Sequence, residues 1–519
     1  MRKDILLGVL VFLWVRTAHP ENLAHSSLPA RNLTILVESL PDTLIPRNAL
    51  DATSQRLGAL LYRGLTRLNK DLEVIPGLAS SWKASNSAKT WTFQIPAGLK
   101  DQAGGAITPT LIAECLEQYR VGKPTSALGK SFKDWKSTEV RGDSVILNSE
   151  KSDPYLDRNI SLLRYFRVAG STVPCQEPRR GDRIIGSGNF APQGTDYFSF
   201  SNQNFLRLVP TDSKRNAPVD FVFVRDDAAR AMKLIKGEVD LIQNGLSLAK
   251  SRWLQKSYSD RFEVIERDGS TISYLSFNLK DPILSKVEVR RAMALAIDRR
   301  DIVDHKLFGF GTIAQTLVSP LLPEAAKLEF PHDLKKSEEL LDQAGFPRGK
   351  NGVRFSLRYK STPIREGLET ALMLQNIFKR IGIEVRLEVV EPAVFLQSVR
   401  KGNYQIFSSR WIGVSDASIL NRTLHSGQNN NRAQYQDAEM DRLLDAASAE
   451  PSLKARLPGL QKIQQKMLDD LPYFPLWFWN NAVVIRKEVQ AKAQLRSEDL
   501  SLTGALDTLV ERLTLLERR

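Results

Sequence analysis

The sequence predicts an α/β protein, because strands and helices alternate along much of the chain. The clearest unit is an apolar strand at 353–360, a helix at 365–381 and an alternating strand at 383–389. A β-α-β order predicts parallel strands with a right-handed crossover. The length of 519 residues allows two or three domains around a large core.

The elements next to this unit extend the same pattern. A helix at 392–400 and a strand at 404–409 repeat it, and Trp411 comes just past the strand. Carboxyl ends of such strands open onto the crevice where α/β proteins bind ligands. We therefore expect Trp411 to face a crevice. The helix at 365–381 is expected to present one apolar face, formed by Leu368, Leu372, Gln375, Phe378 and Ile381.

The stretch 270–320 predicts strand, loop, helix and helix. Residues 272–278 alternate in polarity, and a helix follows a proline-containing loop at 280–286. Asp298 is expected to cap a second, short helix that Gly309 ends. The apolar face of the first helix consists of Val289, Ala292, Met293, Ala296 and Ile297.

The first part of the chain contains shorter elements. Trp91 and Phe93 share one face of a strand and are expected to pack in the core. Thr108 is a suitable N-cap for a helix that reaches residue 120, with proline at its first position. Other predicted elements are a strand at 33–37, a helix at 54–62, a strand at 144–148 and a helix at 334–344 capped by Asp333.

The N-terminus resembles an export signal. A charged start, residues 1–4, precedes an apolar run at 5–15 that is too short to cross a bilayer. We expect a signal peptide of residues 1–27. Because no cysteine follows the apolar run, we expect no lipid anchor, and therefore an exported, soluble mature protein.

The charge and composition are those of a globular protein. The formal net charge is +14, with 42% hydrophobic and 25% charged residues. The basic residues are scattered, which favours a solvated surface over a nucleic-acid partner. The excess of positive charge slightly favours an anionic or peptide-like ligand.

The two cysteines leave two alternatives. An exported protein can form a disulfide between Cys115 and Cys175. Cys115, however, lies with Ile112, Leu116 and Tyr119 on the expected buried face of a helix. A buried free thiol is the commoner state of such a residue, so we expect Cys115 to stay reduced.

No pattern indicates catalysis. The chain has five histidines, no Gly-x-Ser-x-Gly elbow and no zinc motif. His425, beside three asparagines, could touch a ligand or metal, but a loop histidine without such a role is the commoner case. We expect no enzyme activity, no cofactor and no metal.

Several motifs occur together in the order of one family. They closely resemble those of the extracellular solute-binding proteins of peptide and nickel ABC importers, family 5. The strongest are Phe277-Asn278, Val289-Arg290-Arg291-Ala292 and Ala296-Ile297-Asp298-Arg299. Weaker ones are Tyr62-Arg63-Gly64-Leu65, Leu78-Ala79-Ser80-Ser81-Trp82, Gly186-Ser187-Gly188-Asn189-Phe190 and Leu471-Pro472-Tyr473-Phe474-Pro475-Leu476.

The resemblance implies a fold and its division. We expect a two-lobed periplasmic binding protein of type II, with an extra subdomain in the first lobe and an interlobe ligand cleft. The expected parts are signal peptide 1–27, first lobe 28–62, 183–270 and 483–519, subdomain 63–182, and second lobe 271–482.

The resemblance also implies ligand-binding residues. The family's tryptophan after the third strand of lobe two stacks on ligand, and Trp411 matches it. Peptide-binding members place an aspartate three residues later, where this chain has Val414; Asp416 matches a later aspartate. This departure argues against free peptides unless Asp416 takes over the role. Further candidate ligand residues are Arg410, Phe277, Asn278 and Ser187.

The implied function is capture of a small solute or peptide for an ABC permease in the inner membrane. The protein is expected to be periplasmic and monomeric, with no nucleic-acid partner. The alternative is a secreted regulatory or scaffold protein that keeps this fold without transport. Neighbouring permease and ATPase genes would favour transport.

Overall fold

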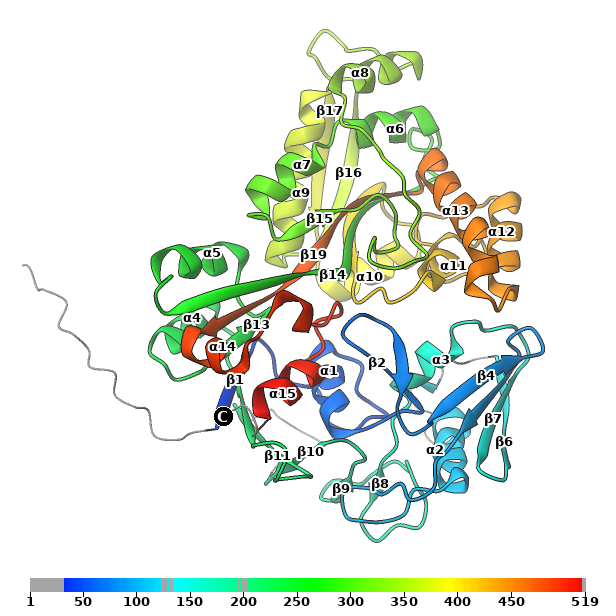
Figure 1. The fold of residues 1–519 in the computed structure, drawn as a ribbon. Helices are drawn as coiled ribbons and strands as arrows, with labels where there is room; N and C mark the ends of the chain where they lie inside the picture. The colour runs from blue at the N-terminus through cyan, green and yellow to red at the C-terminus, as the bar shows by residue number, and fades with distance from the viewer. Residues whose placement is uncertain are drawn as a thin grey trace, which may run out of the picture. The chain divides into compact units, whose positions relative to one another are not determined.

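A large mixed sheet runs through the computed structural model (Figure 1). Its strand order is β10-β11-β12-β1-β13-β19-β14-β18-β16-β17, and β15 (Gly311–Ile313) pairs with β19. Leu33–Arg519 form one compact unit, so the expected boundaries between lobes stay a prediction. The structure describes residues 32–122, 128–129, 132, 134–194, 197 and 204–515, and the expected signal peptide lies outside them.

Two long antiparallel strands, β14 (Phe262–Phe277) and β19 (Tyr473–Arg486), lie in the middle of the sheet. Their pairing is interrupted between Arg267 and Thr271. Gly269 lies in this gap, and a side chain there would collide with the Trp479 carbonyl oxygen. We propose that the chain passes between its two lobes here. The names first lobe, second lobe and subdomain refer to the expected residue ranges.

In the first lobe, parallel strands surround β1 (Leu33–Val37). All five of its residues are buried, as expected for a central parallel strand. It pairs in parallel with β12 (Val219–Phe223) and β13 (Leu241–Gln243), and the strand predicted at 33–37 is thus confirmed. The remaining elements are β10 (Phe190–Gln193), β11 (Phe205–Pro210), α1 (Ala52–Leu61), α4 (Asp227–Ile235), α5 (Leu248–Ser257), α14 (Lys487–Ala493) and α15 (Asp507–Thr514).

In the second lobe, the predicted β-α-β order is confirmed. Strand β16 (Phe355–Ser361) is parallel to both β17 (Ile383–Val389) and β18 (Ile406–Trp411). The other elements are α6 (Val287–Leu295), α7 (Arg299–Asp301), α8 (Leu334–Gln343), α9 (Arg365–Arg380), α10 (Pro392–Arg400), α11 (Ser418–Leu424), α12 (Ala438–Ala449) and α13 (Leu453–Asp470).

The expected buried face of α9 was partly wrong. The helix buries Ala371, Leu374 and Phe378, whereas Leu372 is exposed. The helix is rotated relative to the expected face, because its packing against the sheet decides which apolar stripe is covered. Apolar spacing alone did not distinguish the two stripes.

The subdomain has its own antiparallel sheet in the order β4-β5-β7-β6. Trp91 and Phe93 are buried on β5, as expected from their shared strand face. The Thr108 side chain accepts a hydrogen bond from the Leu111 amide and caps α2 (Pro109–Val121) as predicted. The other elements are β2 (Thr66–Leu68), β3 (Val74–Pro76), β4 (Ser81–Ser85), β5 (Thr90–Gln94), β6 (Trp135–Arg141), β7 (Ser144–Ser149), α3 (Leu156–Asn159), β8 (Arg167–Val168) and β9 (Ile184–Ile185).

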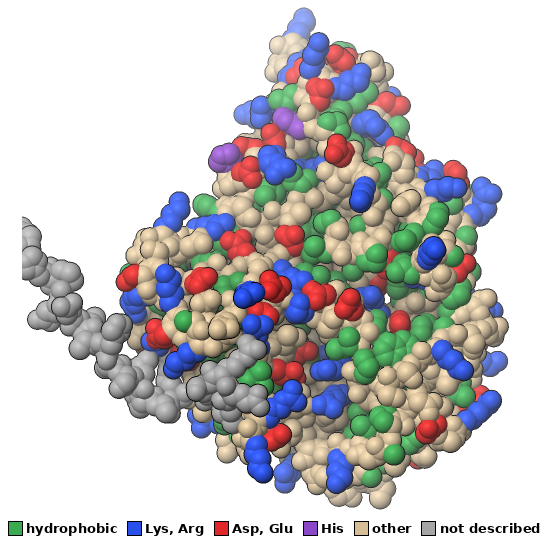
Figure 2. All heavy atoms as spheres, in the orientation of Figure 1, with side chains coloured by type: hydrophobic (Ala, Val, Ile, Leu, Met, Phe, Trp, Pro, Cys, Tyr) green, Lys and Arg blue, Asp and Glu red, His purple; other side chains and the backbone are tan. Residues whose placement is uncertain are grey.

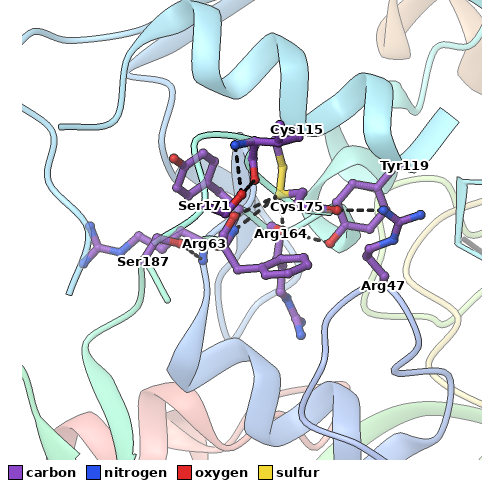
Figure 3. The surroundings of a disulfide bond; sticks show 11 residues. Arg47, Arg63, Cys115, Tyr119, Arg164, Ser171, Cys175 and Ser187 are labelled. Atoms are coloured by element: carbon purple, nitrogen blue, oxygen red, sulfur yellow. Dashed lines mark hydrogen bonds between the residues drawn. A yellow bond between two sulfur atoms is a disulfide. The ribbon is translucent and has the colours of Figure 1, made fainter. Parts of the chain in front are cut away.

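The cysteines form a disulfide (Figure 3), which corrects the expectation that Cys115 stays reduced. Their Cα atoms are 4.8 Å apart, and both residues are buried. The buried face of α2 was rightly predicted, but it packs against the loop that carries Cys175. Arg47 donates to the Cys175 carbonyl oxygen at 2.7 Å and holds this loop in place. Helical periodicity shows that a face is buried without showing what covers it.

The surface is mixed in charge. On the face that Figure 2 shows, basic and acidic side chains are interspersed, which agrees with the scattered basic residues of the sequence. Among the described residues, no helix has the length and apolar character that a membrane span needs.

Candidate functional site

The carboxyl end of β18 is the centre of the candidate site. Arg410 pairs with Ser273 of β14, and Trp411 pairs with Ile272. Because side chains alternate along a strand, Arg410 and Trp411 lie on opposite faces of the sheet. The two expected ligand residues therefore belong to two different surroundings.

Arg410 lines a cavity of about 270 Å³. The cavity lies at the carboxyl ends of the parallel strands β16 and β18, where α/β folds commonly bind ligands. Its walls carry several hydroxyl groups, an apolar side and two charged side chains. The lining residues are Ser273, Ser361, Thr362, Ile364, Glu366, Gly367, Thr370, Pro392, Phe395, Leu396, Ser408, Ser409, Arg410 and Trp479.

The Arg410 guanidinium lies above the Trp479 ring, with 5.4 Å between its carbon and the ring centre. Trp479 is fixed in turn, because its indole N–H donates to the Ser273 hydroxyl at 2.7 Å. Arg410 is exposed and forms no ion pair with a carboxylate of the described residues. The cavity thus combines an aromatic platform with a cation that is available to a ligand.

Trp411 is half-buried on the opposite face. Its ring is stacked on Tyr274 with 5.8 Å between the ring centres, and the Arg432 guanidinium lies 4.2 Å from its centre. Its indole Nε1 is buried and has no acceptor in the described part of the chain. Part of the ring surface that we expected a ligand to use is therefore already in contact with Tyr274 and Arg432.

Asp416 is buried and does not line the cavity. One of its carboxylate oxygens accepts from the Ser418 amide at 2.9 Å, and the other contacts the Ser415 hydroxyl at 3.1 Å. Arg158 of the subdomain lies 4.0 Å away through Nε and donates to the Ser415 carbonyl oxygen at 2.9 Å. The structure thus gives Asp416 a role in a contact between the subdomain and the second lobe.

The other three candidates have structural contacts. Phe277 is fully buried in the core of the second lobe. The Asn278 side chain donates to the carbonyl oxygens of Gly402 and Tyr404. Ser187 accepts from the Arg63 amide at 2.8 Å and donates to a carbonyl oxygen at 2.9 Å. The structure brings none of the three to the cavity, because their side chains stabilise the core and the turns.

Sequence reasoning missed four residues of this region: Tyr274, Trp479, Arg432 and Arg158. The alternation of apolar and polar residues at 272–278 could have assigned Tyr274 to one face of a strand. That strand, β14, pairs with β18, which carries Trp411. Arg432 and Arg158 carry no such signal, because they reach the site from a loop and from the subdomain.

Buried carboxyl groups accompany the Arg158 contact. Burial, together with the nearby Asp416 and Asp157 carboxylates, raises the pKa of Asp153 to about 6 despite a hydrogen bond from the Tyr155 amide. Burial also raises the pKa of Glu324. Across the same contact, the Arg456 guanidinium lies 4.5 Å from the Tyr155 ring centre. Several carboxyl groups therefore lie close together at the contact between the subdomain and the second lobe.

Within the described residues, no group of three or more histidine, cysteine, aspartate or glutamate side chains is arranged to hold a metal ion. The His425 ring lies near two carboxylates, at 3.8 Å from Asp441 and 3.3 Å from Asp445. It also accepts from the Gly427 amide at 2.9 Å. The loop histidine is thus held by its own neighbours.

Comparison with known proteins agrees with this architecture. The chain is 23% identical over 488 residues to the oligopeptide-binding protein AppA of Bacillus subtilis, covering 87% of this chain and 86% of that protein. It is 25% identical over 495 residues to the probable D,D-dipeptide-binding periplasmic protein DdpA of Escherichia coli, covering 90% and 92%.

A solved structure shows the same fold. The ABC transporter substrate-binding protein CtaP of Listeria monocytogenes superposes with a TM-score of 0.78 at 20% identity, covering 93% of this chain and 99% of that one. The architecture is thus the two-lobed type II fold. Residues 73–431, well over half of the chain, match the family described as bacterial extracellular solute-binding proteins, family 5 Middle. The chain belongs to the family 5 extracellular solute-binding proteins.

Proposed function

We propose that this protein captures a peptide-like or related small solute between its two lobes and delivers it to the permease of an ABC importer. One observation carries the proposal: the cavity at the carboxyl ends of β16 and β18, whose lining residues all belong to the second lobe and include the unpaired Arg410. Family membership and the names of the relatives support the same class of function. The protein acts in the periplasm as a monomer, after removal of its signal peptide.

The proposed roles of the site residues follow from their surroundings. Arg410 pairs with an anionic group of the solute, and the hydroxyl groups of the cavity wall supply further hydrogen bonds. Trp411 contributes the exposed part of its ring. Phe277, Asn278 and Ser187 hold the elements that surround the solute and do not contact it.

Closure of the lobes is the proposed event that the permease recognises. The pairing of β14 and β19 is interrupted between Arg267 and Thr271, so the ladder between these two strands does not resist bending at Gly269. Hinge closure of this kind is a common response to ligand in two-lobed proteins. A solute in the cavity gains contacts with the first lobe only in the closed form, and this difference shifts the population toward that form.

The test is native mass spectrometry of the protein purified under mild conditions. We expect a non-covalent small molecule on the parent and its loss from Arg410→Met. Arg422→Met serves as the control, because Arg422 is an exposed arginine of the same lobe. It should keep the molecule.

Absence of any bound solute, followed by no closure in X-ray scattering across a solute library, would contradict the proposal. The alternative of a regulatory or scaffold protein would then be favoured. A permease that fails to bind the solute-loaded protein would contradict the transport part alone.

A further inference from the structure

The end of β18 presents hydrogen-bond donors without matching acceptors. Arg410 is exposed and forms no hydrogen bond with a described residue. Arg432 uses one nitrogen, Nη1, to donate to the Tyr274 hydroxyl at 2.9 Å. The Trp411 indole Nε1 is buried without an acceptor in the described part of the chain. Arg410 lies on the opposite face of the sheet from Trp411. On the Trp411 face, the unused donors are therefore the remaining N–H groups of the Arg432 guanidinium.

Arg432 is held in place beside the ring of Trp411. Its guanidinium carbon lies 4.2 Å from the ring centre, a distance typical of a cation–π contact. Its carbonyl oxygen accepts a hydrogen bond from the Tyr404 hydroxyl, which fixes the backbone of the loop. A guanidinium does not lose its proton in proteins, so this charge is permanent. Arg432 is therefore a preorganised positive charge.

Among the described residues, no carboxylate forms an ion pair with Arg432. Asp416 is buried and engaged with Ser415, Ser418 and Arg158. Val414, which follows Trp411 more closely in the sequence than Asp416 does, is apolar and buried. Glu366 lines the cavity on the Arg410 side of the sheet and therefore faces the other arginine. Arg432 is thus an unpaired positive charge beside the Trp411 ring.

We propose that Arg432 determines the charge preference of the site: beside Trp411 it favours an anionic ligand group that only accepts hydrogen bonds, such as a carboxylate, and disfavours an ammonium. The inference rests on the proposed function, because it names the charge of the solute group that would contact Trp411. An anion accepts hydrogen bonds from the remaining N–H groups of Arg432, whereas an ammonium adds a like charge and more donors. Arg432 thus acts as a specificity-determining residue.

The test uses three probes with one backbone and different charges. N-acetyl-trialanine carries one negative charge, trialanine is a zwitterion, and trialanine amide carries one positive charge. Isothermal calorimetry at low and at physiological ionic strength measures the affinity of each probe. We expect the parent to bind N-acetyl-trialanine at least tenfold more tightly than trialanine amide, with the preference reduced by added salt.

The variants separate charge from packing. Arg432→Met keeps an apolar chain against Trp411 and should bind N-acetyl-trialanine at least tenfold more weakly than the parent. Arg432→Lys restores a positive charge and should recover part of the preference. Arg422→Met, the control in the same lobe, should behave as the parent does. Thermal unfolding of each variant confirms that it is folded.

Three results would overturn the inference: equal or tighter binding of trialanine amide by the parent, an unchanged preference in Arg432→Met, or no binding of any probe. The first two leave the proposed function intact, because the protein still binds a solute. Failure of the proposed function is a different result, in which the purified protein carries no solute and closes on none.

Discussion

Replacement of Arg158 by methionine tests whether the subdomain and the second lobe are held together by charge. Arg158 donates to the carbonyl oxygens of Leu72 and Ser415 and faces the Asp416 carboxylate at 4.0 Å. The two charged side chains are 15% and 2% exposed. Methionine keeps most of the apolar stem while removing the charge and all donors. It leaves Asp416 buried without a cation.

The magnitude follows from the burial and the distances. Removing one partner of a fully buried ion pair costs about 3–5 kcal/mol. Here the separation is long and Asp416 keeps two hydrogen bonds, so we expect a smaller loss of about 2–3 kcal/mol. Asp416→Asn should restore part of this loss in the double variant, because no buried charge then lacks its partner.

The assay is urea unfolding at pH 7.5, followed by tryptophan fluorescence, in a double-mutant cycle of Arg158→Met and Asp416→Asn. Arg141→Met is the matched control, because Arg141 is an exposed arginine of the same subdomain paired with Glu139. It should cost less than about 0.5 kcal/mol. A loss for Arg158→Met no larger than that of the control, or strictly additive effects of the two changes, would refute the reasoning.

Three further outcomes are expected. Replacing Cys115 and Cys175 by alanine should lower the free energy of unfolding by about 3–4 kcal/mol, matched by dithiothreitol on the parent, because the bond closes a 60-residue separation; no loss would contradict a structural role. Asp153→Asn should stabilise the protein by on the order of 2 kcal/mol at pH 7.5 and have no effect near pH 4 in pH-dependent urea titrations. The sign follows from the pKa of Asp153, which is raised to about 6 in the folded protein. The protonated carboxyl group contributes stability below the unfolded pKa, and this contribution is lost as the pH rises through 6. A pH-independent effect of Asp153→Asn would contradict this reasoning. Gly269→Ala should lower the free energy of unfolding by about 2 kcal/mol or more in urea denaturation, because the added methyl group meets the β19 backbone. Gly459→Ala is the control and should not lower it, because nothing lies within 4 Å of its added methyl group. Equal effects of the two variants would show that the pairing of β14 and β19 tolerates a side chain at this position.

Local structure could be predicted from the sequence where the signal is itself local. The caps are an example: the side chains of Asp298 and Asp333 accept from the amides three residues later, as expected. The parallel strands of the second lobe follow from the order of their elements. These features depend on neighbours in the chain, and the sequence contains those neighbours.

Tertiary contacts explain most of the errors. The buried face of α2 was predicted, but the loop that carries Cys175 is placed by tertiary contacts that include Arg47. The motif residues Phe277 and Asn278 were expected at the ligand, yet their side chains stabilise the fold. A motif marks a residue that the fold needs, without showing whether the need is chemical or structural.

The same limit applies to the candidate site. The position of Trp411 at a strand end follows from topology, but Arg432 reaches its ring from the loop before α12. That contact decides how much of the ring is open and which charge stands beside it. A site built from separate segments is thus only partly predictable from one sequence.

The loop after Trp411 connects the proposed site with the contact between subdomain and second lobe. Its Val414 amide donates to the Ser270 carbonyl oxygen at 2.8 Å, at the interruption of β14. Trp411 precedes this attachment and Asp416, which faces Arg158, follows it. A solute that moves Trp411 would therefore act on a segment that is bonded both to β14 at the proposed hinge and to Arg158 of the subdomain. Because coupling between two such contacts is reciprocal, loss of the Arg158 contact should weaken solute binding by the same free energy with which solute strengthens that contact.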